Sequence, residues 1–226
     1  VRDARRKALG EEDPHTISSR NNVAYAHALK GEFEQAISEY KKVLDFSTCI
    51  LGKNHPTTLT IRNNLASAYS ATGKFEDAVS LHKKVCDSRE SVMGAEHPHT
   101  LISKNNLAYV YTLMKKFDIA IPIFEEILDA REKILSVNHP DTLTSRNNLA
   151  CAYKSYGQVD KAIPIFEEVL AIRENVLSVN HPDTLTSRNN LAAAYAQANR
   201  LHEAVAPLVK LLPDCRRALD SEHPLP

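Results

Sequence analysis

The sequence predicts an all-α fold built from stacked helical hairpins. A pair of asparagines returns at a fixed spacing of 42 residues, at Asn21-Asn22, Asn63-Asn64, Asn105-Asn106, Asn147-Asn148 and Asn189-Asn190. The segment Ser136–Ala150 is identical to Ser178–Ala192. A fixed period of this size indicates a repeat architecture, and each repeat must stack on its neighbours to bury its apolar face.

The repeats define one array over residues 1–226. Residues 1–12 match the end of a later repeat, so we expect them to be the tail of a preceding unit. His223-Pro224 matches the start of a further unit, which favours part of a longer array or a longer protein. The expected units are approximately residues 14–55, 56–97, 98–139, 140–181 and 182–223.

Each unit begins with a helix that we call helix A. In the fourth unit helix A is expected from about Pro140 to Tyr156, because proline is favoured in the first turn of a helix. The histidine before this proline also recurs, so each His-Pro pair marks a helix start. Gly157 should end the helix, as Gly31 and Gly73 do in their units.

The second helix of each unit, helix B, is expected from about Asp160 to Leu177 in the fourth unit. Its apolar residues recur at helical spacing, and one position is always alanine, which lets helices A and B approach closely. Pro122 and Pro164 are expected in the first turn, where proline is tolerated. Pro213 should kink or end the last helix B.

The pattern NNLAxAYxxxGxxxxA, with Leu149, Ala150, Tyr153, Gly157 and Ala162, resembles the tetratricopeptide repeat. The tryptophan of that family is replaced by a basic residue, at Arg20, Arg62, Lys104, Arg146 and Arg188. The 42-residue period and the HPDT start resemble the longer repeats of kinesin light chains.

This resemblance implies a right-handed superhelix of hairpins, an α-solenoid, with a concave groove lined by helix A. It implies a non-enzymatic protein- or peptide-binding scaffold that holds an extended segment in that groove. The same repeat type occurs behind nucleotide-binding switch ATPases of the STAND class. A regulatory, autoinhibitory sensor array in such a protein, or a kinesin light chain-type cargo adaptor, is therefore the alternative.

Helical geometry selects the residues that face this groove. At 100° per residue, Leu143, Leu149 and Tyr153 fall on the buried side, and Asn148 falls opposite them. Asparagine offers both donors and an acceptor to a peptide backbone. The predicted ladder is Asn22, Asn64, Asn106, Asn148 and Asn190. Alternatively, these pairs fix the stacking of repeats, and for the Asn147 position both interpretations stay open. We expect substitution of Asn106 and Asn148 to weaken peptide binding without changing the melting temperature.

Selectivity should come from groove positions that differ between repeats. One such position holds Tyr25 and Tyr109, and the next holds Leu29 and Leu113. Repeats one and three therefore offer aromatic and aliphatic contacts, and we predict a peptide that buries apolar side chains there. Alternatively, the tyrosines pack against the next repeat.

The recurrent basic residue falls on the packed side of helix A. We expect Arg146 and its equivalents to pair with carboxylates rather than to form a basic track for a ligand. Glu90, Glu132 and Glu174 recur with the same period and are the candidates. On helix B, Lys41-Lys42 and Lys83-Lys84 give way to glutamate pairs at 125–126 and 167–168. A solvated surface or a head-to-tail self-contact would explain this change, so self-association through the array ends is a possible partner mode.

Composition and motifs argue against other classes. The chain has 28 basic and 28 acidic residues, so nothing favours nucleic-acid binding. It has no apolar run long enough to span a membrane, and its four cysteines share no spacing. The recurrent histidines stand one per repeat and the other histidines are scattered, so they form no metal site, and no phosphate loop or nucleophile motif occurs. We therefore expect no enzyme activity, no metal and no cofactor, and a cytoplasmic location.

Overall fold

The computed structural model describes residues 14–209, and these residues form α-helices joined by short turns. The expectations for residues 1–12, for Pro213 and for His223-Pro224 lie outside the described residues. The helices A are α2 (Pro14–Leu29), α4 (Pro56–Ala71), α6 (Pro98–Leu113), α8 (Pro140–Ser155) and α10 (Pro182–Gln197). The helices B are α3 (Phe33–Leu51), α5 (Phe75–Met93), α7 (Phe117–Ile134), α9 (Val159–Val176) and α11 (Leu201–Val209).

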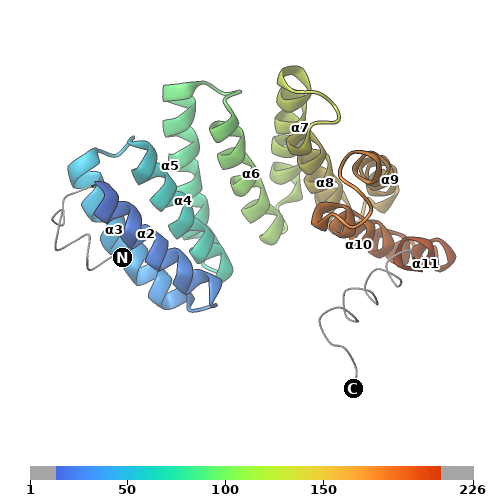
Figure 1. Cartoon of the computed structure of the whole chain (residues 1–226), viewed down its shortest axis with the longest axis horizontal. Helices are drawn as coiled ribbons and strands as arrows, with labels where there is room; N and C mark the ends of the chain where they lie inside the picture. Colours follow the sequence, from blue (N-terminus) through green and yellow to red (C-terminus); the bar gives the residue numbers. More distant parts are fainter. Residues whose placement is uncertain (1–13, 210–226) are drawn as a thin grey trace. The chain divides into compact units, whose positions relative to one another are not determined.

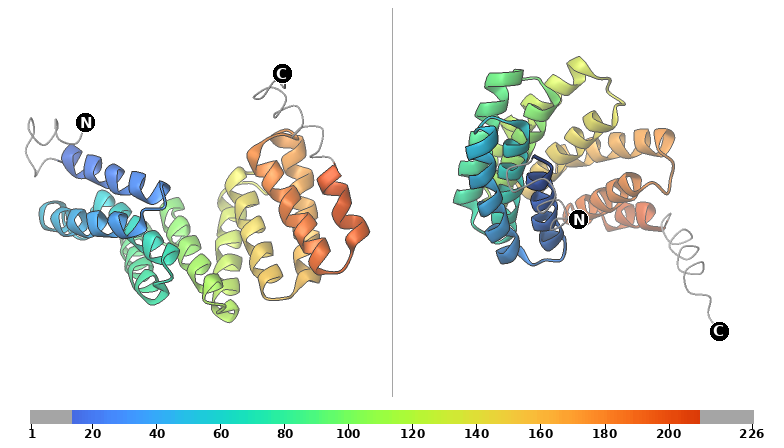
Figure 2. Two further views of the ribbon diagram at one scale, coloured as in Figure 1. Left: turned by 90° about the horizontal axis from the view of Figure 1, so that it is seen from below. Right: turned by 60° about the vertical axis from the view of Figure 1, so that its left-hand side comes forward.

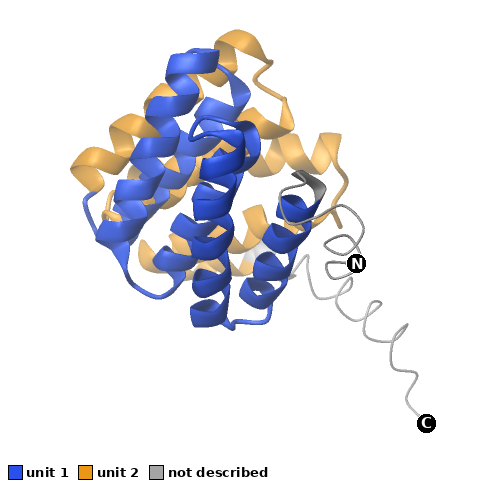
Figure 3. Ribbon diagram, turned by 90° about the vertical axis from the view of Figure 1, so that its left-hand side faces the viewer, with its two compact units in different colours: residues 1–116 blue, residues 117–226 orange. Residues whose placement is uncertain are grey.

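Consecutive helices pack as hairpins, which confirms the predicted all-α solenoid class (Figures 1 and 2). The chain divides into two compact units (Figure 3). Unit 1 comprises residues 1–116 and contains α2 to α6. Unit 2 comprises residues 117–226 and contains α7 to α11. Helices A contact one another within each unit, α2 with α4, α4 with α6, and α8 with α10.

Each His-Pro pair begins a helix A, as predicted, and the structure shows why histidine stands there. The ring Nδ1 of His139 accepts a hydrogen bond from the backbone N–H of Asp141 at 3.1 Å. His55, His97 and His181 make the same contact two residues on, at 3.2 Å. The histidine therefore caps the helix by satisfying an N–H that has no partner within the helix.

Helix A ends at a residue in the left-handed region. Gly31, Gly73 and Gly157 have φ values of 78°, 75° and 88°, as the sequence predicts. Lys115 and Asn199 occupy the same position with φ values of 58° and 59°. The next residue then donates back to the helix, for example from the backbone N–H of Gln158 to the carbonyl of Tyr153 at 2.9 Å. This is the Schellman arrangement, and it turns the chain toward helix B.

The placement of two prolines was wrong. Pro122 and Pro164 are not in the first turn but inside α7 and α9, which start at Phe117 and Val159. Each proline stands five residues after the first residue of its helix and therefore lies in the second turn, although the observed start of α9 is within one residue of the predicted one. Both proline side chains are exposed, and the helices continue through them.

The recurrent alanine of helix B is buried, as predicted. Ala36, Ala78, Ala120 and Ala162 are 0% exposed. In helix α8, Leu143 and Leu149 are also buried. The core of each unit therefore lies between its helices A and B.

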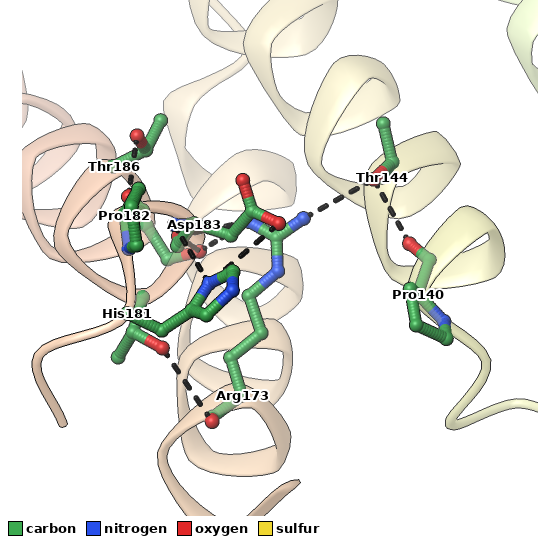
Figure 4. Close-up of polar contacts among 9 residues, drawn as sticks. Pro140, Thr144, Arg173, His181, Pro182, Asp183 and Thr186 are labelled. Atoms are coloured by element: carbon green, nitrogen blue, oxygen red, sulfur yellow. Dashed lines mark hydrogen bonds and ion pairs between the residues drawn. The ribbon is translucent and has the colours of Figure 1, made fainter. Parts of the chain in front are cut away.

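A second buried layer joins each hairpin to the next, and the sequence analysis missed it. The buried Arg173 of α9 donates from Nη1 to the backbone carbonyl of Asp183 at 3.0 Å and to Ser187 Oγ at 2.8 Å. Its Nη2 also donates to Thr144 Oγ1 (Figure 4). Arg89 and Arg131 repeat the contacts of Nη1 with Ser103 and Ser145. We call this contact the arginine junction.

Candidate peptide-binding surface

Unit 1 carries a pocket of about 180 Å³ on the side of the helices A that the sequence predicts to face a ligand. We call it the helix-A pocket. Helices α4, α5 and α6 form it, and its lining is mostly apolar. The lining residues are Ser67, Ser70, Ala71, His82, Asn106, Tyr109, Val110 and Leu113.

Three of the predicted site residues come together at this pocket. Tyr109 and Leu113 line it while remaining 56% and 39% exposed, and Asn106 lines it beside them. Tyr25 and Leu29 lie on α2, are 50% and 71% exposed, and are not part of its lining. The exposure of Tyr25 argues against the alternative in which the neighbouring repeat covers it.

The asparagine pairs are used differently from the expectation. The side-chain Nδ2 of Asn64 donates to Oδ1 of Asn21 in the preceding repeat at 3.1 Å. Asn106 donates to Asn63 at 3.0 Å. In unit 2, Asn190 donates to Asn147 at 3.1 Å. The second asparagine of each of these pairs therefore contacts a neighbouring repeat, so part of the predicted ladder is structural.

These contacts leave part of each amide available. Asn64 and Asn106 remain partly exposed on their helices. Asn147 is 8% exposed, which resolves its two interpretations in favour of a structural role. Asn22 is exposed and Asn148 is partly exposed on their helices. The surface can thus accept N–H groups of a ligand, which is less than the full backbone pairing expected.

His82 is the pocket residue that sequence reasoning missed. It occupies the position of helix B that holds Tyr40, Phe124 and Phe166 in other repeats. It is 1% exposed, and its Nδ1 has no hydrogen-bond partner. Burial lowers the pKa of His82 to about 4, so the ring is neutral at pH 7. The sequence does mark this residue, because His82 stands at a repeat position that holds tyrosine or phenylalanine in three other repeats.

The recurrent basic residue of helix A is structural, as predicted, in the third to fifth repeats. Arg146 Nη2 lies 2.7 Å from Glu132 Oε1, and its Nη1 lies 2.5 Å from Glu168 Oε1. Arg188 makes the same contact with Glu174 at 2.7 Å. Lys104 lies 3.6 Å from Glu90. These cations are therefore occupied by carboxylates of their own chain.

The glutamates that replace lysine on helix B are also engaged in unit 2. The hydroxyl of Tyr153 donates to Glu125 at 2.6 Å, and this hydrogen bond raises the pKa of Tyr153 to about 12. Tyr195 donates to Glu167 in the same way. Part of the acidic surface is thus fixed to the neighbouring helix A rather than presented to a partner.

Within residues 14–209, no group of three or more His, Cys, Asp or Glu side chains is arranged to hold a metal ion. Cys49, Cys86 and Cys151 are free thiols. None of the described helices is long and apolar enough to cross a membrane.

A family model described as tetratricopeptide repeat matches residues 15–91, 99–175 and 157–217. The structure of a Podosopora anserina putative kinesin light chain with nearly identical TPR-like repeats is 30% identical to this chain. The match covers 93% of this chain and 97% of that one, with a TM-score of 0.74. A comparison with curated proteins gave no match.

Two more distant structures share the fold. BtubC (BKLC) from P. vanneervenii is 24% identical, covers 97% of this chain and 89% of that chain, and has a TM-score of 0.75. A Rap protein complexed with Competence and Sporulation Factor is 13% identical, covers 83% of this chain and 50% of that chain, and has a TM-score of 0.69.

The family match spans more than half of the chain, and the 30% identical structure is aligned over nearly its whole length. The helix starts, the left-handed helix ends and the alanine positions recur with the same 42-residue period. The chain therefore belongs to the tetratricopeptide repeat family, with repeats of the kinesin light chain type.

Proposed function

We propose that this chain is a non-enzymatic scaffold that holds an extended segment of a partner protein against its helices A. The helix-A pocket is the single observation that supports this most, because predicted contact residues line a real hollow. Proteins of this repeat family are in general interaction scaffolds, and repeat arrays offer extended binding surfaces.

The pocket suits an apolar side chain of the partner. Its walls are alanine, valine, leucine and the tyrosine ring, and ligand sites are commonly apolar with few polar groups. Asn106 at the wall can accept a backbone N–H through Oδ1, which would fix the orientation of an extended segment. Asn64 offers the same group one repeat earlier.

Other members of the predicted set extend this surface in the proposal. Tyr25 and Leu29 are exposed apolar side chains on α2 and would contact the segment away from the pocket. In unit 2 the equivalent positions are Cys151 and Ser155, which are smaller or polar. We therefore propose that the apolar anchors of the segment bind unit 1, and that the scaffold acts in the cytoplasm as a single array over residues 1–226.

A narrower proposal is a cargo adaptor of the kinesin light chain type. The 30% identity to the putative kinesin light chain favours it over the sensor array of a switch ATPase. A heptad segment upstream of Val1 in the complete gene product would support the adaptor, whereas a phosphate-binding loop would support the switch protein.

A pull-down followed by peptide-array mapping tests the scaffold. Tyr109→Ala with Leu113→Ala should weaken a captured peptide about tenfold or more, since two exposed apolar contacts are removed. Val92→Ala on α5 is the control, because Val92 is a 61% exposed apolar side chain that does not line the pocket. The proposal would be contradicted if the double variant and the control weakened peptide binding equally, or if neither weakened it.

A further inference from the structure

Unit 1 has a second hollow, of about 380 Å³, whose residues are mainly basic and polar. It lies between the turn before α4, helix α4 and helix α5, away from the residues of the helix-A pocket. We call it the Arg62 pocket. Its lining residues are Lys53, Asn54, Arg62, Lys84, Asp87, Ser88 and Ser91.

Comparison with a later repeat shows that two carboxylates are missing from the surroundings of Arg62. Arg146, two repeats after Arg62, is held between Glu132 and Glu168. The residues two repeats before these glutamates are Thr48 and Lys84. Both carboxylates that neutralise the later arginine are therefore replaced in this repeat, one by a neutral residue and one by a cation.

Arg62 itself is partly buried and makes no ion pair in the described part of the chain. Its Nη1 donates only to the backbone carbonyl of Lys53, at 3.3 Å. Partial burial lowers the pKa of Arg62, and no carboxylate contributes an opposing shift. A planar guanidinium in this state is suited to bind a carboxylate or phosphate through two parallel hydrogen bonds.

The surrounding groups increase the preference for an anion. Lys53 and Lys84 are exposed cations at the same hollow, and Asp87 is its single carboxylate. Ser88, Ser91 and Asn54 add donors that can contact further oxygens. Three positive charges against one negative charge leave the site basic in a chain that is neutral as a whole.

We propose that the Arg62 pocket binds the carboxylate or phosphate group of an acidic segment of a partner protein. The bound group takes the place that glutamate fills beside Arg146 and Arg188. The site is separate from the helix-A pocket, so the inference does not depend on the apolar contacts proposed above.

The test is a titration of the full chain, followed by ¹H–¹⁵N NMR, with three synthetic peptides of equal length. One contains Glu and Asp, one contains phosphoserine, and one contains Gln and Asn. Inorganic phosphate is titrated as well, to separate a phosphate site from a peptide site. We expect saturable shifts at residues 53–62 and 84–91 with the acidic and phosphorylated peptides, and none with the neutral peptide.

Variants assign the effect to the pocket. Arg62→Gln should weaken the acidic peptide about tenfold, in line with a lost charge-assisted hydrogen bond. Thr48→Glu with Lys84→Glu restores the internal carboxylates, and it should abolish binding while raising the melting temperature. Lys83→Glu is the control, because this exposed neighbour carries the same charge but does not line the pocket.

Three results would overturn the inference. They are an absence of shifts at these residues, equal shifts with the neutral peptide, or equal weakening of the acidic peptide by Lys83→Glu and by Arg62→Gln. Tyr109→Ala with Leu113→Ala should leave the titration unchanged. Failure of the helix-A pocket and failure of the Arg62 pocket are therefore distinguishable.

Discussion

At the level of a single side chain, His82 affects the stability of the fold, the pH dependence of that stability and the shape of the helix-A pocket. Tyrosine or phenylalanine fills the same core position in three other repeats. A smaller ring with an unpartnered Nδ1 lines the pocket in this repeat. A buried polar atom without a hydrogen-bond partner destabilises the fold.

This residue should make the protein less stable in mild acid. The folded-state pKa of about 4 lies below the unfolded value of about 6.5, so between these values only the unfolded state takes up the proton. Stability therefore falls as pH drops from 6.5 to 4, by about 2–3 kcal/mol for this group. His82→Phe should remove that part of the slope, as measured by urea unfolding at pH 7 and pH 4.

The same substitution should also fill the helix-A pocket and weaken a bound peptide at pH 7. If the free energy of unfolding of the His82→Phe variant keeps the slope of the parent between pH 7 and pH 4, His82 is not the group responsible.

The asparagine pairs make contacts between repeats that the geometry of a single helix cannot predict. The helical wheel places Asn148 and its equivalents on the polar side, and the structure keeps them partly exposed. The helical wheel carries no information on the offset between neighbouring repeats. That offset brings Asn106 Nδ2 to 3.0 Å from Asn63 Oδ1. The hydrogen bonds between repeats support the alternative in which the asparagine pairs fix the stacking of repeats.

Asn106→Ala should lower the free energy of unfolding by about 1 kcal/mol, the usual net contribution of one hydrogen bond. This replaces the expectation of an unchanged melting temperature. Asn22→Ala is the control, because Asn22 is exposed and makes no such bond among the described residues. Chemical denaturation of both variants is the measurement, and an equal effect would contradict a structural role for Asn106.

At the level of helices, much of the hairpin followed from the sequence. Proline at the start and glycine at the end of helix A have fixed conformational preferences, so Pro140 and Gly157 mark its boundaries within one or two residues. The arginine junction was not predictable in this way. Arg173 and Ser187 belong to different repeats, and only the packing of α9 on α10 brings them together.

The junction also varies between repeats in a coupled way. Where later repeats have arginine and serine, the first junction has Ser47 and Ile61, and both are buried. At the first junction Ser47 Oγ donates instead to the carbonyl of Leu44 within its own helix, at 3.1 Å.

Arg173→Ala should destabilise unit 2 by about 2–3 kcal/mol, because buried acceptors lose their donor. Arg173→Ser with Ser187→Ile copies the first junction and should recover part of the loss. Guanidinium unfolding of the single and double variants forms a double-mutant cycle. Additive effects would show that the two positions are not coupled.

For the whole molecule, the fold class could be predicted because a strict period repeats the same information five times. The binding specificity could not, because it depends on positions where the repeats differ, such as Tyr109 and its equivalent Cys151. The helix-A pocket needs α4, α5 and α6 together, and His82 comes from the middle helix. No single repeat contains that combination.

The central claim is that a partner segment lies against the helix-A pocket. Site-specific photo-crosslinking tests it most directly, with a photoreactive phenylalanine analogue at Tyr109 and, separately, at the exposed Val92 of α5, which does not line the pocket. In cell extract, the analogue at Tyr109 should crosslink to a partner segment, and adding Leu113→Ala should reduce the yield. The analogue at Val92 should not crosslink to it. Equal crosslinking from both positions, or crosslinking from Val92 alone, would contradict the account.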